Sequence, residues 1–184
     1  MLAPSEIIYG VKNTKVSSWD IAYALNMAIA CLITYWLMTR VLSGFVDKPS
    51  DFLGGMWAVV ATVFVFRETR LRSLSAGIAR LIATCVSFAL CLLYLSLFRF
   101  TPVGMAALIG IGTAAMALLG RRDDIVTTGI TTAVVMVVAA MSPEGAWHQP
   151  LLRLADTIVG IAVGVACKWI GSFLFYKFIG EHAR

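Results

Sequence analysis

Two short sequences near opposite ends of the chain each combine an arginine with a threonine one helical turn later. They are Arg80-Leu-Ile-Ala-Thr84 and Arg153-Leu-Ala-Asp-Thr157, and both lie within or at the start of an apolar segment. A charge inside such a segment costs about 2.5–3.5 kcal/mol on membrane-insertion scales and tends to mark a cavity or a charged partner. The pattern therefore indicates a site that can hold an anion such as a carboxylate.

Arg80 is the strongest candidate for an anion contact. Gly77, Arg80 and Thr84 recur at three- and four-residue spacing, so a helix presents them on one small, polar face. The alternative is structural, with the guanidinium extended to lipid phosphates or paired with Asp123 or Asp124. The sequence leaves the two interpretations open.

Asp156 is the carboxylate that falls within a predicted span, and Arg153 is its nearest local partner. Buried there, it can carry a coupling proton; near the helix start, it stabilises the helix dipole, which is the role we favour. Depth predicts no direct pairing of Asp156 with Arg80, because the two lie toward opposite membrane faces. The candidate substrate-binding residues are Arg80, Thr84, Gly77, Asp156 and Thr157.

Motifs typical of enzymes are absent from the sequence. HExxH, GxSxG and a phosphate-binding loop are not found. The four cysteines lie in apolar segments without CxxC spacing, and neither His148 nor His182 has a partner that would suggest catalysis or zinc binding. We therefore predict no enzymatic activity, no metal and no other cofactor.

The composition indicates a bilayer protein. Mean hydropathy is +0.87, with 60% hydrophobic and 14% charged residues, whereas soluble chains are typically about 25% charged. The formal charge of +5 is spread over short loops, with no basic face for nucleic acid. Membrane lipids are the predicted surroundings, and frequent Gly and Ala favour closely packed helices.

Six apolar segments predict an all-α, polytopic membrane protein with six transmembrane helices. A spanning helix needs about 20 residues, and two of the segments are shorter. We divide the chain into a cytoplasmic lead-in (1–20), a transmembrane domain (21–178) and a cytoplasmic tail (179–184). The predicted spans are 21–41, 54–66, 74–98, 103–119, 125–141 and 151–176.

The loop charges predict the orientation. Nine Lys and Arg residues fall on the side of both termini, against four on the opposite side, Arg153 among them. Since short cytoplasmic loops carry the excess of basic residues, both termini are predicted to be cytoplasmic.

Three spans per half make any repeat inverted, and Trp57 precedes Arg80 by the same interval as Ile130 precedes Arg153. A 3+3 inverted repeat would place a site between its halves.

The chain resembles the fusaric acid resistance-like and aromatic acid exporter families of the bacterial inner membrane, which are similar to the aluminium-activated malate transporters. The resemblance covers roughly residues 52–164. The residues that carry it are Trp57-Ala-Val-Val-Ala-Thr, the basic turn after it, Ser75-Ala-Gly-Ile-Ala-Arg-Leu-Ile-Ala-Thr84, and Asp156-Thr-Ile-Val-Gly-Ile-Ala-Val-Gly164.

The resemblance implies a six-helix module that moves organic anions such as aromatic carboxylates, with Arg80 as an anion contact. Larger members pair two such modules and add a soluble domain, whereas this chain has one module. We therefore expect a homodimer, formed through small-residue faces such as Gly160-xxx-Gly164 and the ladder that ends at Ser87. The alternative function is a non-transporting subunit that packs with and stabilises another membrane complex.

Overall fold

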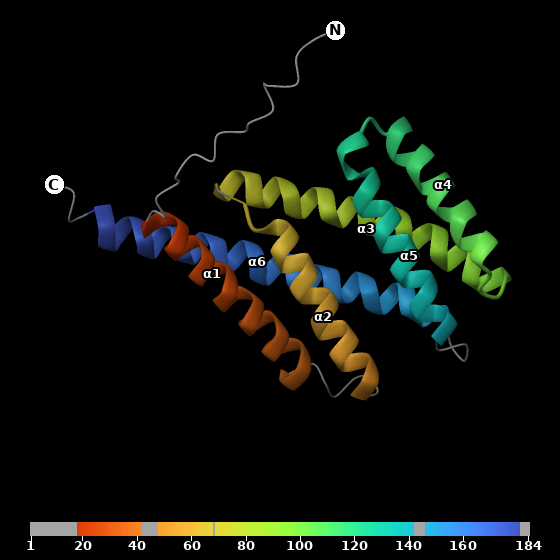
Figure 1. The fold of residues 1–184 in the computed structure, drawn as a ribbon, viewed down its shortest axis with the longest axis horizontal. Coiled ribbons are helices and arrows are strands. Elements are labelled where there is room, and N and C mark those ends of the chain that lie inside the picture. The colour runs from red at the N-terminus through yellow and green to blue at the C-terminus, as the bar shows by residue number, and fades with distance from the viewer. Residues whose placement is uncertain (1–17, 42–47, 68, 142–145, 181–184) are drawn as a thin grey trace, which may run out of the picture.

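The computed structural model describes residues 18–41, 48–67, 69–141 and 146–180, and their regular structure is entirely helical (Figure 1). A π-helical turn, Leu37–Val41, continues the first helix, and a 3-10 turn, Arg122–Asp124, precedes the fifth. The six α-helices are α1 (Ser18–Trp36), α2 (Lys48–Val65), α3 (Arg70–Leu97), α4 (Pro102–Leu118), α5 (Ile125–Met141) and α6 (His148–Gly180).

Each of the six predicted segments lies on one of these six helices, and the largest difference is at the start of α2. The sequence predicted a loop over 44–51, but the helix already begins at Lys48. Pro49 explains this difference, because the fixed φ of proline suits the first turn of a helix. Residues 1–17 of the predicted lead-in and 181–184 of the predicted tail lie outside the described residues.

Local signals set the starts of α3 and α4 and the end of α4. Thr69 caps α3, and its hydroxyl accepts a hydrogen bond from the Arg72 amide at 3.3 Å. Thr101 caps α4 in the same way, accepting from the Gly104 amide at 3.0 Å. Both are the N-cap contacts that threonine favours. Gly120, with φ of 71°, ends the α4 region in a conformation that glycine adopts without strain.

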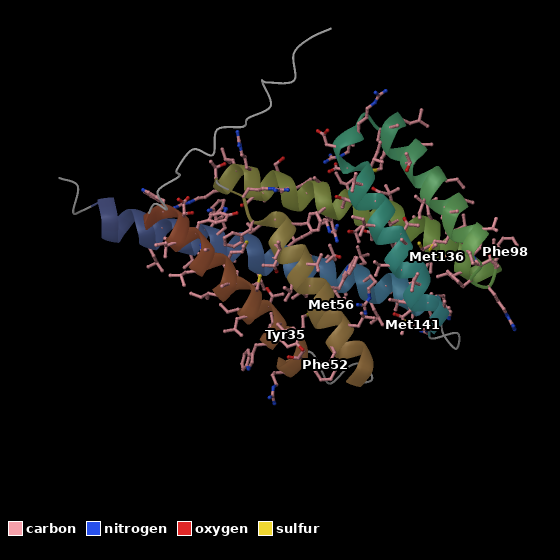
Figure 2. All side chains as sticks on the ribbon, in the orientation of Figure 1. Tyr35, Phe52, Met56, Phe98, Met136 and Met141 are labelled. Atoms are coloured by element: carbon pink, nitrogen blue, oxygen red, sulfur yellow. The ribbon has the colours of Figure 1, made fainter. Side chains whose placement is uncertain are left out.

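The outer surface of the helices is apolar. Figure 2 labels five outward side chains of this kind, Tyr35, Phe52, Met56, Phe98 and Met141, and each is 39–78% exposed. Within the described ranges, four helices are long and apolar enough to cross a membrane, while α4 and the apolar part of α2 are shorter. Such a surface requires a hydrocarbon solvent, so the chain is a multi-pass membrane protein.

The helices pack in matched pairs around α3 and α6, the two longest helices, which contact each other. In the first half α1 packs on α2, and α2 packs on α6; in the second half α4 packs on α5, and α5 packs on α3. Figure 1 shows successive helices running in alternating directions through the bundle. This arrangement is compatible with an inverted repeat, which remains a prediction.

The contact between α2 and α6 depends on glycine. A Cβ atom at Gly160 would overlap the carbonyl oxygen of Ala58, and one at Gly164 would lie 3.3 Å from Thr62. The close approach lets the Thr62 hydroxyl donate to the Gly160 carbonyl at 2.9 Å. The Gly160-xxx-Gly164 face is therefore buried inside the chain and does not provide the dimer contact that the sequence suggested.

Ser87 holds the corresponding place between α3 and α5. It follows Arg80 by seven residues, as Gly160 follows Arg153. Its hydroxyl donates to the Thr128 carbonyl at 3.0 Å and accepts from the Thr132 hydroxyl at 3.1 Å. Ser87 is thus also committed to a contact within the chain.

Candidate functional site

Arg80 lies on the buried face of α3, with 2% of its surface exposed. Its guanidinium carbon is 4.6 Å from the centre of the Phe64 ring and 5.5 Å from that of Trp57. None of its three side-chain nitrogens has a hydrogen-bond partner among the residues that the structure describes. Two aromatic faces from α2 therefore hold the cation, and its N–H groups stay available for a carboxylate, which arginine can bind with two parallel hydrogen bonds.

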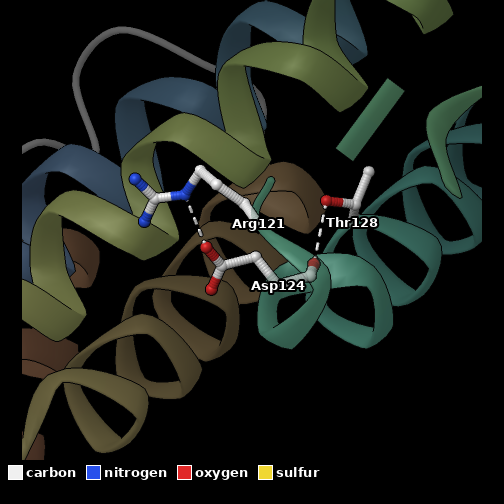
Figure 3. Close-up of polar contacts among 3 residues, drawn as sticks. All are labelled: Arg121, Asp124 and Thr128. Carbon is white, nitrogen blue, oxygen red and sulfur yellow. Dashed lines mark hydrogen bonds and ion pairs between the residues drawn. The ribbon is translucent and has the colours of Figure 1, made fainter. Parts of the chain in front are cut away.

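The structural alternatives for Arg80 are not observed. Its burial is incompatible with extension to lipid phosphates at the surface. Asp124 instead accepts from Arg121, with Nε to Oδ2 at 2.8 Å, in the turn before α5 (Figure 3). Asp123 is exposed. Arg80 is consequently a buried cation without an acidic partner in the described part of the chain.

Asp156 and Arg153 form a buried ion pair on α6, as their spacing predicted. Arg153 Nη1 lies 2.9 Å from Asp156 Oδ2, and the residues are 1% and 5% exposed. Because α6 begins at His148, Asp156 lies beyond the first turn, and the predicted helix-dipole role is wrong. Arg153 is buried within α6, so the predicted count of loop charges becomes nine basic residues on the side of the termini against three on the other.

Gly54 on α2 provides space for this carboxylate. An added Cβ at Gly54 would lie 3.0 Å from Asp156 Oδ1, tighter than ordinary contact. A larger residue there would press on the ion pair. This contact could not be predicted from the sequence, because Gly54 and Asp156 are far apart in the chain.

Trp57 connects the two arginine-threonine sequences. Its indole Nε1 donates to Thr157 Oγ1 at 3.1 Å, and its ring is one of the two beneath Arg80. Thr157 in turn donates to the Arg153 carbonyl at 2.8 Å. The sequence analysis identified Trp57 only through the repeat interval and the family resemblance. The signal that could have identified its contact is the indole N–H, which needs a hydrogen-bond acceptor when it is buried in an apolar segment.

The remaining predicted residues support the helices around the site. Thr84 is buried and donates to the Arg80 carbonyl at 2.9 Å, the same bond that Thr157 makes to Arg153. An added Cβ at Gly77 would lie 3.0 Å from Ile161, so Gly77 allows α3 to approach α6. These positions shape the site without offering a free polar group.

Lys168 belongs to a second cluster. A lysine near the end of an apolar segment commonly extends its ammonium to the membrane surface, whereas Lys168 is 6% exposed. Its ammonium lies 4.6 Å from the centre of the Tyr23 ring and 5.5 Å from that of Phe66. The Tyr23 hydroxyl donates to the Phe66 carbonyl at 3.1 Å, which joins α1 to the end of α2.

The site chemistry is cationic. Its charged groups are the buried guanidiniums of Arg80 and Arg153 and the buried carboxylate of Asp156, and of the two guanidiniums Arg153 is the one paired with that carboxylate. In the described ranges no group of three or more His, Cys, Asp or Glu side chains could hold a metal ion. A helical bundle with an apolar exterior and a buried, positively charged centre is typical of multi-pass membrane transport proteins.

Residues 29–167, most of the chain, match the family described as fusaric acid resistance protein-like. The chain belongs to this family, whose members are membrane transport proteins. The resemblance to aluminium-activated malate transporters is consistent with this membership. No curated protein sequence matches the chain, and no solved structure matches it.

Proposed function

We propose that the protein is a bacterial inner-membrane transporter or channel for organic anions, which exports aromatic carboxylates and acts as a homodimer. Arg80 carries this proposal. It is a guanidinium with 2% exposure and no hydrogen-bond partner among the described residues. Burying such a charge is costly unless something pairs with it, and an entering carboxylate supplies that pair.

The proposed topology has six crossings, with the termini in the cytoplasm. The alternating directions of successive helices support the six crossings, as does the packing of α2 on α6 and of α5 on α3. In this arrangement α2 and α4 are short crossings, packed against longer neighbours. Arg80 and Trp57 come from the first half and Thr157 from the second, so the site lies between the halves of the proposed repeat.

The proposed dimer uses α4. The small-residue faces of α6 and Ser87 are occupied within the chain, whereas Ala106, Gly110 and Ala114 are exposed at four-residue spacing along α4. A Cβ at Gly110 would meet nothing within 4 Å. Small residues at this spacing let two membrane helices approach closely.

The test is flux of aromatic carboxylates in liposomes that contain the purified protein. Benzoate uptake above that of protein-free liposomes is expected, with saturation at high benzoate concentration. A nonaromatic monocarboxylate of similar size, such as hexanoate, serves as the comparison for aromatic preference. Absence of flux for both anions would contradict transport and favour the role of a non-transporting subunit.

A further inference from the structure

Two charged side chains meet α2, and a third is paired with one of them. Arg80 lies between the rings of Trp57 and Phe64, and Asp156 lies against Gly54, which precedes Trp57 by three residues, or roughly 4.5 Å along the helix axis. Arg153 is joined to Asp156 by the ion pair. All three are at least nine-tenths buried, so water screens them little.

Among the residues that the structure describes, these three give the site an excess of one positive charge. Arginine remains protonated in proteins, so two guanidiniums exceed one ionised carboxylate by one. Arg80 has no hydrogen-bond partner in the described part of the chain, and Arg153 Nε has none either. Lys168 is roughly 22 Å along α6 from Arg153, in its own aromatic cluster.

A ligand with one negative charge neutralises this site. Its carboxylate can pair with Arg80 while Asp156 keeps Arg153. A ligand with two negative charges would bring its second carboxylate toward Asp156, and like charges repel strongly where water is excluded. Removal of the Asp156 charge would free Arg153 for that second carboxylate.

We propose that Asp156 is a specificity-determining residue that makes the site select monovalent over divalent organic anions. This inference rests on the proposed function, because it assumes that the anion enters beside Arg80. The Asp156 carboxylate pairs with Arg153, the guanidinium that would otherwise bind a second carboxylate of the ligand. Its charge, and not its shape, excludes dianions.

The experiment compares benzoate with terephthalate, which has the same ring and a second carboxylate. Uptake into liposomes is measured at pH 7.5 on both sides. The wild-type protein is expected to prefer benzoate, and Asp156→Asn is expected to shift the benzoate to terephthalate rate ratio toward terephthalate by about tenfold or more. The double variant Arg153→Gln/Asp156→Asn restores the single excess charge and is expected to restore the preference for benzoate.

A binding measurement separates this inference from the proposed function. Each anion should raise the unfolding temperature of the detergent-solubilised protein according to its affinity, with the same order of preference in each variant. If the wild type moves neither anion but binds them in this order, transport is contradicted and the charge selection is supported. Equal benzoate and terephthalate effects in the wild type would overturn the selection.

An unchanged ratio in Asp156→Asn would overturn the inference. So would a shifted ratio that the double variant fails to restore, because shape rather than charge would then be responsible. If Asp156→Asn does not fold, Arg153→Gln tests the same balance by lowering the excess charge to zero. It is expected to weaken benzoate binding about tenfold, and unchanged binding would contradict the proposal.

Discussion

Trp57 on α2 and Thr157 on α6 are joined by a hydrogen bond of 3.1 Å across 100 residues of sequence. Both are buried, and the indole that donates this bond also lies beneath Arg80. The two arginine-threonine sequences thus meet at one tryptophan. A change in the position of α2 relative to α6 would therefore also move the Trp57 ring on which the Arg80 guanidinium lies.

Trp57→Phe tests this connection, because phenylalanine keeps an aromatic face for Arg80 and removes the N–H donor. We expect loss of the hydrogen bond to lower the free energy of unfolding by about 0.5–1.5 kcal/mol. The smaller ring of phenylalanine lowers it separately, through lost packing. Thr157→Val leaves the buried indole N–H unsatisfied and should cost about 1–3 kcal/mol. Equilibrium unfolding in micelles measures both.

The double variant supplies the control for this pair. Residues in direct contact are expected to be non-additive, so Trp57→Phe/Thr157→Val should lose less stability than the sum of the single variants. Strict additivity would show that the bond contributes nothing to the folded protein.

Gly160→Ala and Gly110→Ala form a matched pair for helix packing. At Gly160 the added methyl group would overlap the Ala58 carbonyl, so α2 and α6 must separate and the Thr62 bond is lost. We expect a loss of about 1–3 kcal/mol, the usual cost of overpacking. Gly110 has open space, and alanine there should leave the stability of the monomer unchanged or raise it. Equal melting temperatures for the two variants would contradict the tight α2–α6 contact.

The helices could be predicted from the sequence because hydrophobic runs and their breaks are local properties. Thr101-Pro102 marked the start of α4, and the spacing of Arg153 and Asp156 predicted their ion pair. Arg80 was identified because a charge in an apolar run is visible without a structure.

The other parts of the site depend on contacts between distant segments. The partner of Trp57 lies 100 residues away, and the space at Gly54 becomes meaningful only beside Asp156. Arg153 was counted as an outer loop charge because the start of α6 was placed three residues too late, at 151 instead of His148. The burial of Lys168 could not be predicted, because the aromatic residues around its ammonium come from α1 and the end of α2, which are distant in the sequence.

The charge asymmetry predicts the orientation. With Arg153 buried, nine basic residues face three, so cysteines placed at Lys12 and Arg184 should react only with reagent on the cytoplasmic side. The measurement uses a membrane-impermeant maleimide on intact cells and on inverted vesicles, with the four native cysteines replaced. Labelling of either position in intact cells would reverse the topology.

The dimer should persist in mild detergent at low protein concentration. Gly110→Leu places a branched side chain on the exposed face of α4, where nothing in the chain contacts it, and should shift the protein toward monomer. Cys85→Leu, on the exposed face of α3, is the control and should remain dimeric. Light scattering of the detergent complex measures the mass. A wild-type monomer at every concentration would contradict the dimer.

Arg80→Ala and Arg80→Lys distinguish a ligand contact from a packing role. If Arg80 binds the carboxylate, alanine removes a charge-assisted contact of about 1.5–3 kcal/mol, or roughly 10- to 150-fold in affinity. Lysine should recover only part of this, because an ammonium cannot form two parallel hydrogen bonds to one carboxylate. Arg99→Ala, an exposed arginine at the opposite end of α3, is the matched control and should retain wild-type flux. The measurement is benzoate flux per folded dimer in liposomes, with folding checked by gel filtration. Equal flux in wild type and both Arg80 variants would remove Arg80 from the substrate site and leave its contacts with Trp57 and Phe64 as packing.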